Sequence, residues 1–264
     1  MPNQVDAFSK KYGPWSIVAG ASEGIGAAFA MALAKKGLNL ILLARRIDKL
    51  ETLADKIRST YPVDVILMNM DLGEPSEVDH MLENLNQEIG LLVYNAAFSP
   101  IGNFEDISEE DLSKITHVNI RTPLLMLKSV SKQMIARKKG GVILMSSLSG
   151  TQGSPKIATY AASKSFNTIL AEGLWKELGS KGIDVMACCA GAVRTPGYLR
   201  SKSQKDAPGT LDPEEVADSA LKALGKGPVV VPGFTNKVAR FVMGRLLPRK
   251  TAISIMYKNT KDLK

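Results

Sequence analysis

The sequence has little of the material that several classes of protein require. It holds only two cysteines, the adjacent Cys188 and Cys189, which excludes a disulfide framework and a Cys-x-x-Cys metal spacing. Its two histidines, His80 and His117, stand in helical segments without an acidic or cysteine cluster, so we expect no metal site. No apolar run approaches the roughly 18 uncharged residues that cross a bilayer. The first residues lack the apolar core of a signal peptide, so we expect a cytoplasmic protein.

Most of the chain also lacks an excess of charge. Residues 234–264 hold eight Lys or Arg and one Asp, so this segment carries +7 of the total net charge of +8. Residues 1–233 carry only +1. Because nucleic-acid binding usually requires a basic stripe on the folded body, we expect no nucleic-acid partner.

What the sequence does have is an alternation of apolar runs and amphipathic segments. The runs predict strands at 15–19, 39–43, 63–70, 91–94, 142–145, 183–189 and 229–231. The segments between them predict helices at 24–36, 47–59, 75–89, 108–137, 159–179 and 213–225. Near-continuous apolar strands that alternate with helices predict a single-domain, doubly wound Rossmann-type α/β fold, a parallel sheet with helices on both faces. We therefore expect a catalytic domain at 1–233 and a basic C-terminal extension at 234–264.

A glycine-rich turn, "GASEGIG", directly follows the first predicted strand. Gly20, Gly24 and Gly26 allow a tight turn, let the backbone approach a pyrophosphate and leave a helix N-terminus facing an anion. A plain strand-to-helix connection is the alternative, because glycine spacing alone is common. The position after the first strand favours dinucleotide binding.

The end of the second predicted strand carries Ala44, Arg45 and Arg46, with no acidic residue before Asp48. An acid at this point would bind a ribose 2′-hydroxyl, whereas arginine pairs with a 2′-phosphate. The alternative is that the arginines only cap an exposed strand end. Beside a glycine turn, they predict NADP in preference to NAD.

Tyr160 and Lys164 lie one helical turn apart in "YAASKSF" and project from the same face. A phenol titrates at about 10 in water, so it is a poor acid or base at neutral pH unless a cation favours the phenolate. Lys164 can be that cation, and Ser147 follows the strand predicted at 142–145. An ordinary exposed Tyr and Lys pair is the alternative, which the upstream glycine turn disfavours.

Residues 13–233 resemble the short-chain dehydrogenase/reductase superfamily in several ordered motifs. "GASEGIG" resembles its cofactor turn, "DL" at 71–72 its adenine-contacting pair, and "YNAA" at 94–97 its NNAG segment. "AGAVRT" at 190–195 resembles the segment that holds the nicotinamide. Three positions depart from the family pattern without removing a catalytic group: Ala19, Ala97 and Ala190.

The resemblance implies roles for individual residues. Tyr160 is the general acid when a carbonyl is reduced, Ser147 hydrogen-bonds the substrate oxygen, and Asn119 holds a water of the proton relay. Lys164 binds the nicotinamide ribose and lowers the tyrosine pKa. Ser22 and Arg45 contact the 2′-phosphate, and Val193 and Thr195 the carboxamide. The full set of expected cofactor contacts is Gly20, Ser22, Gly24, Ile25, Gly26, Arg45, Arg46, Asp71, Leu72, Asn95, Ala96, Tyr160, Lys164, Gly191, Val193 and Thr195.

The resemblance favours an NADP(H)-dependent oxidoreductase that transfers a hydride between nicotinamide and a carbonyl or alcohol substrate. A lipid-like substrate is favoured, such as a 3-oxoacyl thioester or a hydroxysteroid-type ketone. The alternative is a non-catalytic NADP(H)-binding sensor or scaffold, which would have no need of the phenol and its lysine. Residues 194–212 predict a mobile lid over the substrate. Arg200, Lys202 and Lys205 in it could attract a phosphate-bearing carrier, although a solvated loop is favoured.

The basic extension predicts an amphipathic helix. Its apolar face would hold Phe234, Val238, Phe241, Val242 and Leu246, with Lys237 and Arg240 to the side and Arg245 within it. Packing on its own domain or on a sister subunit of a homodimer or homotetramer is favoured. Contact with a membrane surface is the alternative.

Overall fold

The computed structural model describes residues 3–201, 206–261 and 263. Seven parallel strands form one sheet in the order β3-β2-β1-β4-β5-β6-β7. The strands are β1 (Trp15–Ala19), β2 (Asn39–Ala44), β3 (Val65–Asn69), β4 (Ile89–Tyr94), β5 (Gly140–Ser147), β6 (Ile183–Ala190) and β7 (Val229–Val230). The order reverses between β1 and β4, which confirms the predicted doubly wound fold.

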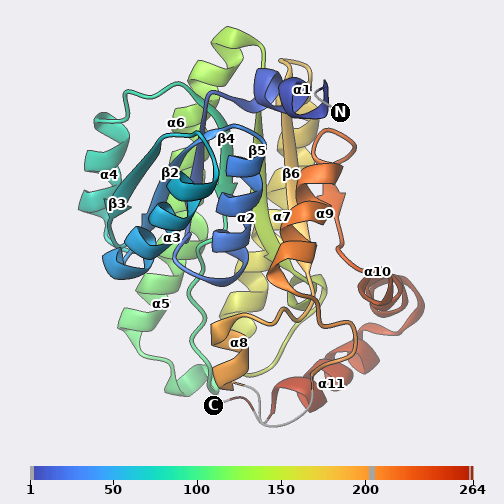
Figure 1. Ribbon diagram of the computed structural model, residues 1–264. Helices are drawn as coiled ribbons and strands as arrows, with labels where there is room; N and C mark the ends of the chain where they lie inside the picture. The colour runs from blue at the N-terminus through green and yellow to red at the C-terminus, as the bar shows by residue number, and fades with distance from the viewer. Residues whose placement is uncertain (1–2, 202–205, 262, 264) are drawn as a thin grey trace.

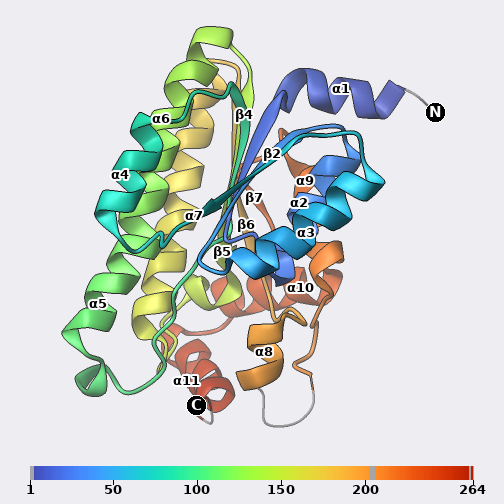
Figure 2. The ribbon, with the colours of Figure 1, turned by 60° about the vertical axis from the view of Figure 1, so that its left-hand side comes forward.

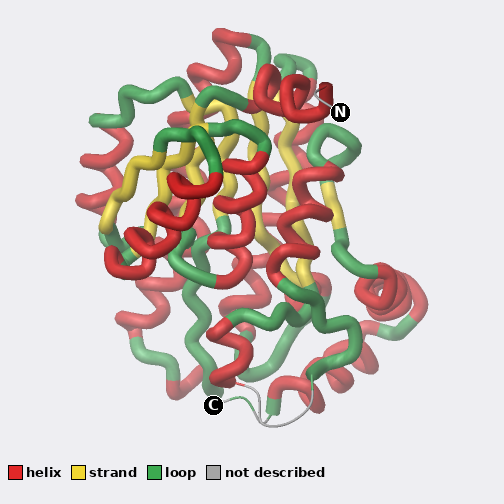
Figure 3. Tube along the Cα trace, in the orientation of Figure 1, coloured by secondary structure: helices red, strands yellow, loops and turns green. Residues whose placement is uncertain are grey.

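Helices cover both faces of the sheet (Figures 2 and 3). On one face lie α1 (Asn3–Tyr12), α2 (Gly24–Lys35), α3 (Ile47–Thr60) and α9 (Pro213–Ala223). On the other face lie α4 (Pro75–Glu83), α5 (Glu109–Thr116), α6 (Thr122–Arg137) and α7 (Ala158–Gly179). The sheet is therefore the middle of three layers.

The strands hold these layers together because their side chains alternate between the two faces. Leu40 and Leu42 belong to the core under α2, α3 and α9, whereas Ile41 and Leu43 belong to the core under α4, α6 and α7. All four side chains are fully buried. A strand that is buried on both faces needs apolar residues at every position, which is why the runs in the sequence are nearly continuous.

Two predicted helices differ from the structure. The segment 108–137 is divided into α5, a π-helical turn η2 (His117–Arg121) and α6. Pro123, near the start of α6, has no N–H to donate, and the wider π-turn just before it accommodates this loss, so the backbone stays helical from α5 into α6. The helix predicted at 75–89 ends at Glu83, and the next residue, Asn84, donates its side-chain amide to the carbonyl of His80 at 2.8 Å.

The carboxyl ends of the strands lead into short helices on the side of the molecule away from α1 (Figure 1). They are the 3₁₀ helix η3 (Leu148–Thr151), α8 (Pro196–Ser201), α10 (Phe234–Phe241), the π-helical turn η4 (Val242–Leu246) and α11 (Arg249–Thr260). The last three form the basic extension, whose separation from a domain at 1–233 stays a prediction. In the part of the chain that the structure describes, no helix is long and apolar enough to cross a membrane.

Candidate active site

A cavity of about 480 Å³ lies at the carboxyl ends of β1, β2, β3 and β4. Such a position, at the point where the strand order reverses, is where open α/β sheets bind ligands. Eleven of the predicted cofactor residues line it: Gly20, Ser22, Gly24, Ile25, Arg45, Arg46, Asp71, Leu72, Asn95, Ala96 and Thr195. Gly26, Gly191, Val193, Tyr160 and Lys164 are not among its lining residues.

The glycine turn has the form that a dinucleotide requires. Neighbouring backbone leaves no room for side chains at Gly20 and Gly26, so only glycine permits a turn this tight. A Cβ on Gly20, whose φ is +79°, would lie 2.8 Å from the Ala96 backbone. A Cβ on Gly26 would lie 2.0 Å from the Gly20 carbonyl oxygen, so Gly26 packs beneath the turn and does not line the cavity. The amide of Asn95 donates to that same carbonyl at 2.9 Å and ties the turn to the end of β4.

Helix α2, which follows the glycine turn, presents its N-terminus to the cavity. Gly24 and Ile25, its first residues, line the wall, and no side chain caps the end of the helix. The free N–H groups of a helix N-terminus suit an anion such as a pyrophosphate. Glu23, just before the helix, is paired with Arg46 at 3.0 Å and with Arg200 at 3.5 Å, which offsets its charge.

The cations at the rim contact neighbouring side chains, and the predicted contacts of Ser22 and Arg45 with a 2′-phosphate stay predictions. Arg46 donates to the Ser22 hydroxyl at 3.0 Å. Arg45 lies 3.7 Å from the carboxylate of Asp71, which Lys114 on α5 also approaches at 3.6 Å. Lys114 lines the cavity and is missed by sequence reasoning, since nothing in an amphipathic helix shows which lysine a distant strand end will meet.

Tyr160 and Lys164 lie on α7 beside the end of β5. The Lys164 side chain is buried, its Nζ donates to the carbonyl of Met145 at 2.9 Å, and it lies 5.4 Å from the centre of the Tyr160 ring. Burial raises the pKa of the half-buried Tyr160, and a hydrogen bond with Ser147 opposes that rise. Burial lowers the pKa of Lys164 to about 8. The structure thus brings Tyr160, Ser147 and Lys164 together, as predicted.

The Ser147 hydroxyl is held from the loop that follows β5. The Ser149 hydroxyl donates to the Ser147 oxygen at 2.9 Å and the Ser149 N–H at 3.2 Å. Ser154 donates in turn to the Ser149 carbonyl at 3.0 Å. An oxygen that accepts twice keeps its own proton free to donate, either to Tyr160 or to a substrate oxygen.

Asn119 lies in the π-helical turn η2 and is buried. Its side-chain amide donates to the Phe98 carbonyl and to the Ser163 hydroxyl, both at 2.9 Å, and its oxygen accepts from the Phe98 N–H at 2.8 Å. Asn119 therefore fastens the cavity residue Phe98 to α7, close to Tyr160. These contacts occupy the side chain of Asn119. That Asn119 holds a water of the proton relay stays a prediction.

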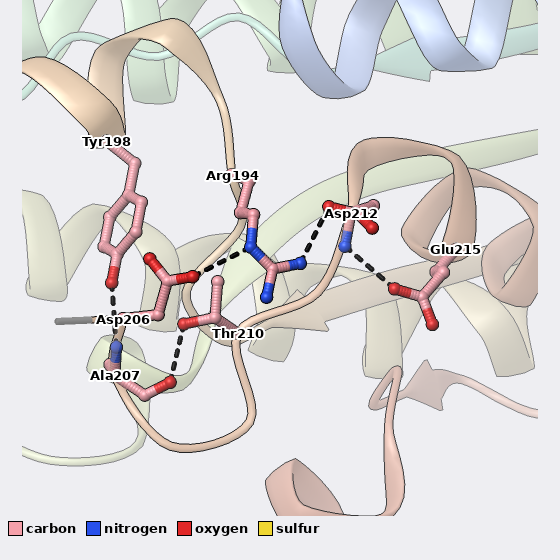
Figure 4. A network of polar contacts seen from close by, with 7 residues as sticks. All are labelled: Arg194, Tyr198, Asp206, Ala207, Thr210, Asp212 and Glu215. Carbon is pink, nitrogen blue, oxygen red and sulfur yellow. Dashed lines mark hydrogen bonds and ion pairs between the residues drawn. The ribbon is translucent and has the colours of Figure 1, made fainter.

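The loop after β6 is tied together by Arg194 (Figure 4). Its guanidinium donates to Asp206 and to Asp212, both at 2.8 Å, and these two carboxylates raise the pKa of Arg194. Tyr198 adds a contact by accepting from the Ala207 N–H at 3.0 Å. These contacts join the two ends of the segment 194–212. That the segment is a mobile lid stays a prediction, and Lys202 and Lys205 lie outside the described residues.

Two residues of the basic extension also hold this side of the site, and sequence reasoning missed both. Asn236 on α10 is buried and donates to the carbonyls of Gly209 and Pro232, both at 3.0 Å. Its oxygen lies 2.6 Å from where a Cβ on Gly191 would be, so it packs on the predicted nicotinamide segment. Arg249 on α11 donates to the carbonyl of Thr151 in η3 at 2.8 Å.

Several proteins are similar in sequence to this chain over most of its length. A 7beta-hydroxysteroid dehydrogenase of Clostridium sardiniense is 33% identical over 233 residues, which cover 87% of this chain and 89% of that protein. The inactive hydroxysteroid dehydrogenase-like protein 1 of Rattus norvegicus is 31% identical over 90% of this chain and 74% of its own length.

Solved structures of dehydrogenases are also similar to this chain. A 7beta-hydroxysteroid dehydrogenase studied for its stereoselectivity matches with a TM-score of 0.87 at 29% identity, covering 94% of this chain and 98% of the other. A short-chain dehydrogenase from Sphingobium yanoikuyae in complex with NADPH matches with a TM-score of 0.78 at 25% identity, covering 89% and 96%. A model of the short chain dehydrogenase family matches residues 14–206. The chain belongs to the short-chain dehydrogenase family and is an oxidoreductase that binds a nicotinamide cofactor.

Proposed function

We propose that this protein interconverts a hydroxysteroid-type alcohol and its ketone with NADP(H). The observation that carries the proposal is the cluster of Tyr160, Ser147 and the buried Lys164 beside a cavity that fits a dinucleotide. The names of the Clostridium sardiniense relative and of the matched 7beta-hydroxysteroid dehydrogenase structure support the substrate class. A 3-oxoacyl thioester remains the other lipid-like candidate.

The residues divide the chemistry among themselves. The cofactor, when bound, supplies or accepts a hydride at the substrate carbon. In reduction, Tyr160 Oη gives its proton to the substrate oxygen, and Ser147 donates a hydrogen bond to the same atom. Burial raises the pKa of Tyr160, so the phenol carries that proton at neutral pH. Lys164, as a cation, stabilises the phenolate that remains and lowers the cost of the transfer.

NADP is proposed in preference to NAD because the rim of the cavity is basic. Arg45, Arg46 and Lys114 all line it, and the Arg46 guanidinium and Ser22 hydroxyl already lie together as a pair that could hold a 2′-phosphate. The NADPH complex of the Sphingobium yanoikuyae relative supports the same choice. A cytoplasmic location and a homodimer or homotetramer stay predictions.

A non-catalytic NADP(H)-binding sensor is the second candidate, favoured by the inactive relative from Rattus norvegicus. The geometry favours an enzyme, because a sensor has no use for a phenol bonded to a serine and backed by a buried lysine. The decisive experiment follows NADPH oxidation at neutral pH across a panel of hydroxysteroid ketones, 3-oxoacyl thioesters and small ketones. We expect turnover on at least one bulky lipid-like ketone. Tight NADPH binding without turnover on any of them would establish the sensor.

A further inference from the structure

The basic extension turns an apolar face to solvent. We call Phe234, Val238, Phe241 and Leu246 the tail face, and their exposed fractions are 81%, 45%, 59% and 62%. The extension does pack on its own domain, through the buried Asn236, Ala252 and Thr260. Of the five apolar residues predicted to form one face, the four of the tail face are exposed and Val242 is partly buried. Large apolar side chains exposed side by side on one helix mark an interaction surface more often than scattered ones do.

The π-helical turn η4 keeps this face continuous. Phe234, Val238 and Phe241 follow the three- and four-residue spacing of one side of α10. In a regular α-helix, Leu246 would point away from Phe241, which is five residues earlier. The N–H of Leu247 bonds the carbonyl of Val242 at 3.0 Å, five residues back, and this wider turn brings Leu246 nearer to the side of Phe241 than a regular α-helix would.

The charge around the tail face is of one sign. Residues 234–261 hold seven Lys or Arg and no Asp or Glu. Lys237 and Arg245 are exposed on the same two helical elements, and no ion pair within the described part of the chain uses them. A second copy of the chain, docked face to face, would bring these cations together and be repelled. An anionic surface with an apolar interior complements both features.

We propose that the tail face docks the protein on an anionic lipid surface, with its aromatic and aliphatic side chains in the acyl boundary and its cations at the headgroups. The extension lies at the same end of the molecule as the site (Figures 1 and 2), and Arg249 bonds the carbonyl of Thr151 in the loop that follows Ser147. Docking would therefore bring the site close to the bilayer. This last step rests on the proposed function, because only an apolar substrate would gain from it.

The test is flotation of the full chain with vesicles of phosphatidylcholine, with and without phosphatidylglycerol. We expect binding to the anionic vesicles alone and release at high salt, because both surface charges are then screened. Phe234→Ser with Phe241→Ser, and separately Lys237→Gln with Arg245→Gln, should each weaken binding by roughly ten-fold or more. Ile169→Ser on α7 is the matched control, because Ile169 is an apolar side chain, 64% exposed, on a helix that is not part of the extension. This control should bind like the wild type.

Three results would overturn the proposal. The first is that the wild type does not bind vesicles, and the second is that the tail-face variants bind them as well as the wild type does. The third is that the wild type does not bind vesicles and light scattering gives the tail-face variants a lower molar mass than the wild type. The last result would assign the face to a second copy. Flotation uses no substrate, so a failure of the proposed function leaves this test intact, and turnover of a soluble ketone should be unchanged in the tail-face variants.

Discussion

The two sides of the site are built in different ways. On the cofactor side, backbone meets backbone: the N–H groups of Asn95 and Ala96 donate to the Ala19 carbonyl at 3.0 and 2.8 Å, and Gly20 has no room for a Cβ. On the other side, which we call the substrate side, lie the loop after β6 and the basic extension. Besides the backbone bonds between Ala192, Arg194 and Leu211, single side chains join distant pieces of chain there, namely Arg194, Asn236 and Arg249.

This difference predicts which contacts of the site can be replaced by substitution and which cannot. Backbone contacts at the glycine turn do not depend on which side chains surround the turn, so we expect the turn to keep its shape when those side chains change. Side-chain contacts, in contrast, can be exchanged one at a time, which lets the substrate pocket vary on a constant cofactor frame. We therefore expect substitutions on the cofactor side to alter which nucleotide is used and those on the substrate side to alter the KM for the substrate, with Tyr160 between them.

Tyr160→Phe should have the largest effect, because it removes the proton that both sides are arranged to deliver. Turnover should fall by roughly two to four orders of magnitude while NADPH binding, followed by fluorescence, survives. Burial raises the pKa of Tyr160, so in the wild type the phenolate needed for alcohol oxidation forms only as pH rises. Oxidation should thus increase with pH in the wild type and lose that dependence in the variant.

The control for that variant is Tyr257→Phe, which removes a phenol hydroxyl from an exposed position on α11. It should leave turnover and the pH profile unchanged. Near wild-type turnover in Tyr160→Phe would show that another group supplies the proton.

Arg45→Asp tests the cofactor side and should have the next largest effect. The substitution removes a cation from the rim of the cavity and places a second carboxylate near Asp71, so a 2′-phosphate loses an attraction and gains a repulsion. The ratio of kcat/KM with NADPH to that with NADH should fall about 30-fold, equivalent to about 2 kcal/mol. Lys49→Asp makes the same change of charge on the exposed first turn of α3, outside the cavity lining, and should shift the ratio little. A wild type that uses NADH as well as NADPH would contradict our assignment of this rim.

The sequence predicts more of the cofactor side than of the substrate side, for a physical reason. A glycine turn, a strand end and a Tyr-to-Lys spacing are each short-range, so each can be seen in a few consecutive letters. The apolar runs likewise predict the sheet, because a strand buried on both faces has no polar position. The contacts between side chains are not visible in this way: that Arg46 meets Ser22 depends on how the chain turns after β2, which no local pattern records.

Contacts between distant segments are what the sequence could not supply. Lys114 reaches Asp71 only because α5 packs above the end of β3, and Asn236 reaches Gly209 only because α10 folds back over the loop after β6. Asn236 in an amphipathic helix looks like one more polar residue of a solvated face. The π-helical turn at 117–121 was equally hidden, because Pro123 alone does not show whether the helix predicted at 108–137 widens or ends there.

Asn236→Ala should have the smallest effect and tests whether the substrate side depends on single side chains. Removing the amide leaves the carbonyls of Gly209 and Pro232 without their donor, which costs about 1 kcal/mol of stability and loosens the loop after β6. We expect the KM for the ketone to rise roughly three- to ten-fold, the effect of one neutral hydrogen bond, while kcat changes less than about two-fold. Asn236→Asp, which keeps the shape but not the N–H donors, should behave in the same way, and the exposed Asn259→Ala should resemble the wild type. A fall in kcat at constant KM would mean that Asn236 acts on the chemical step, and the contrast between the two sides would then be wrong at this residue.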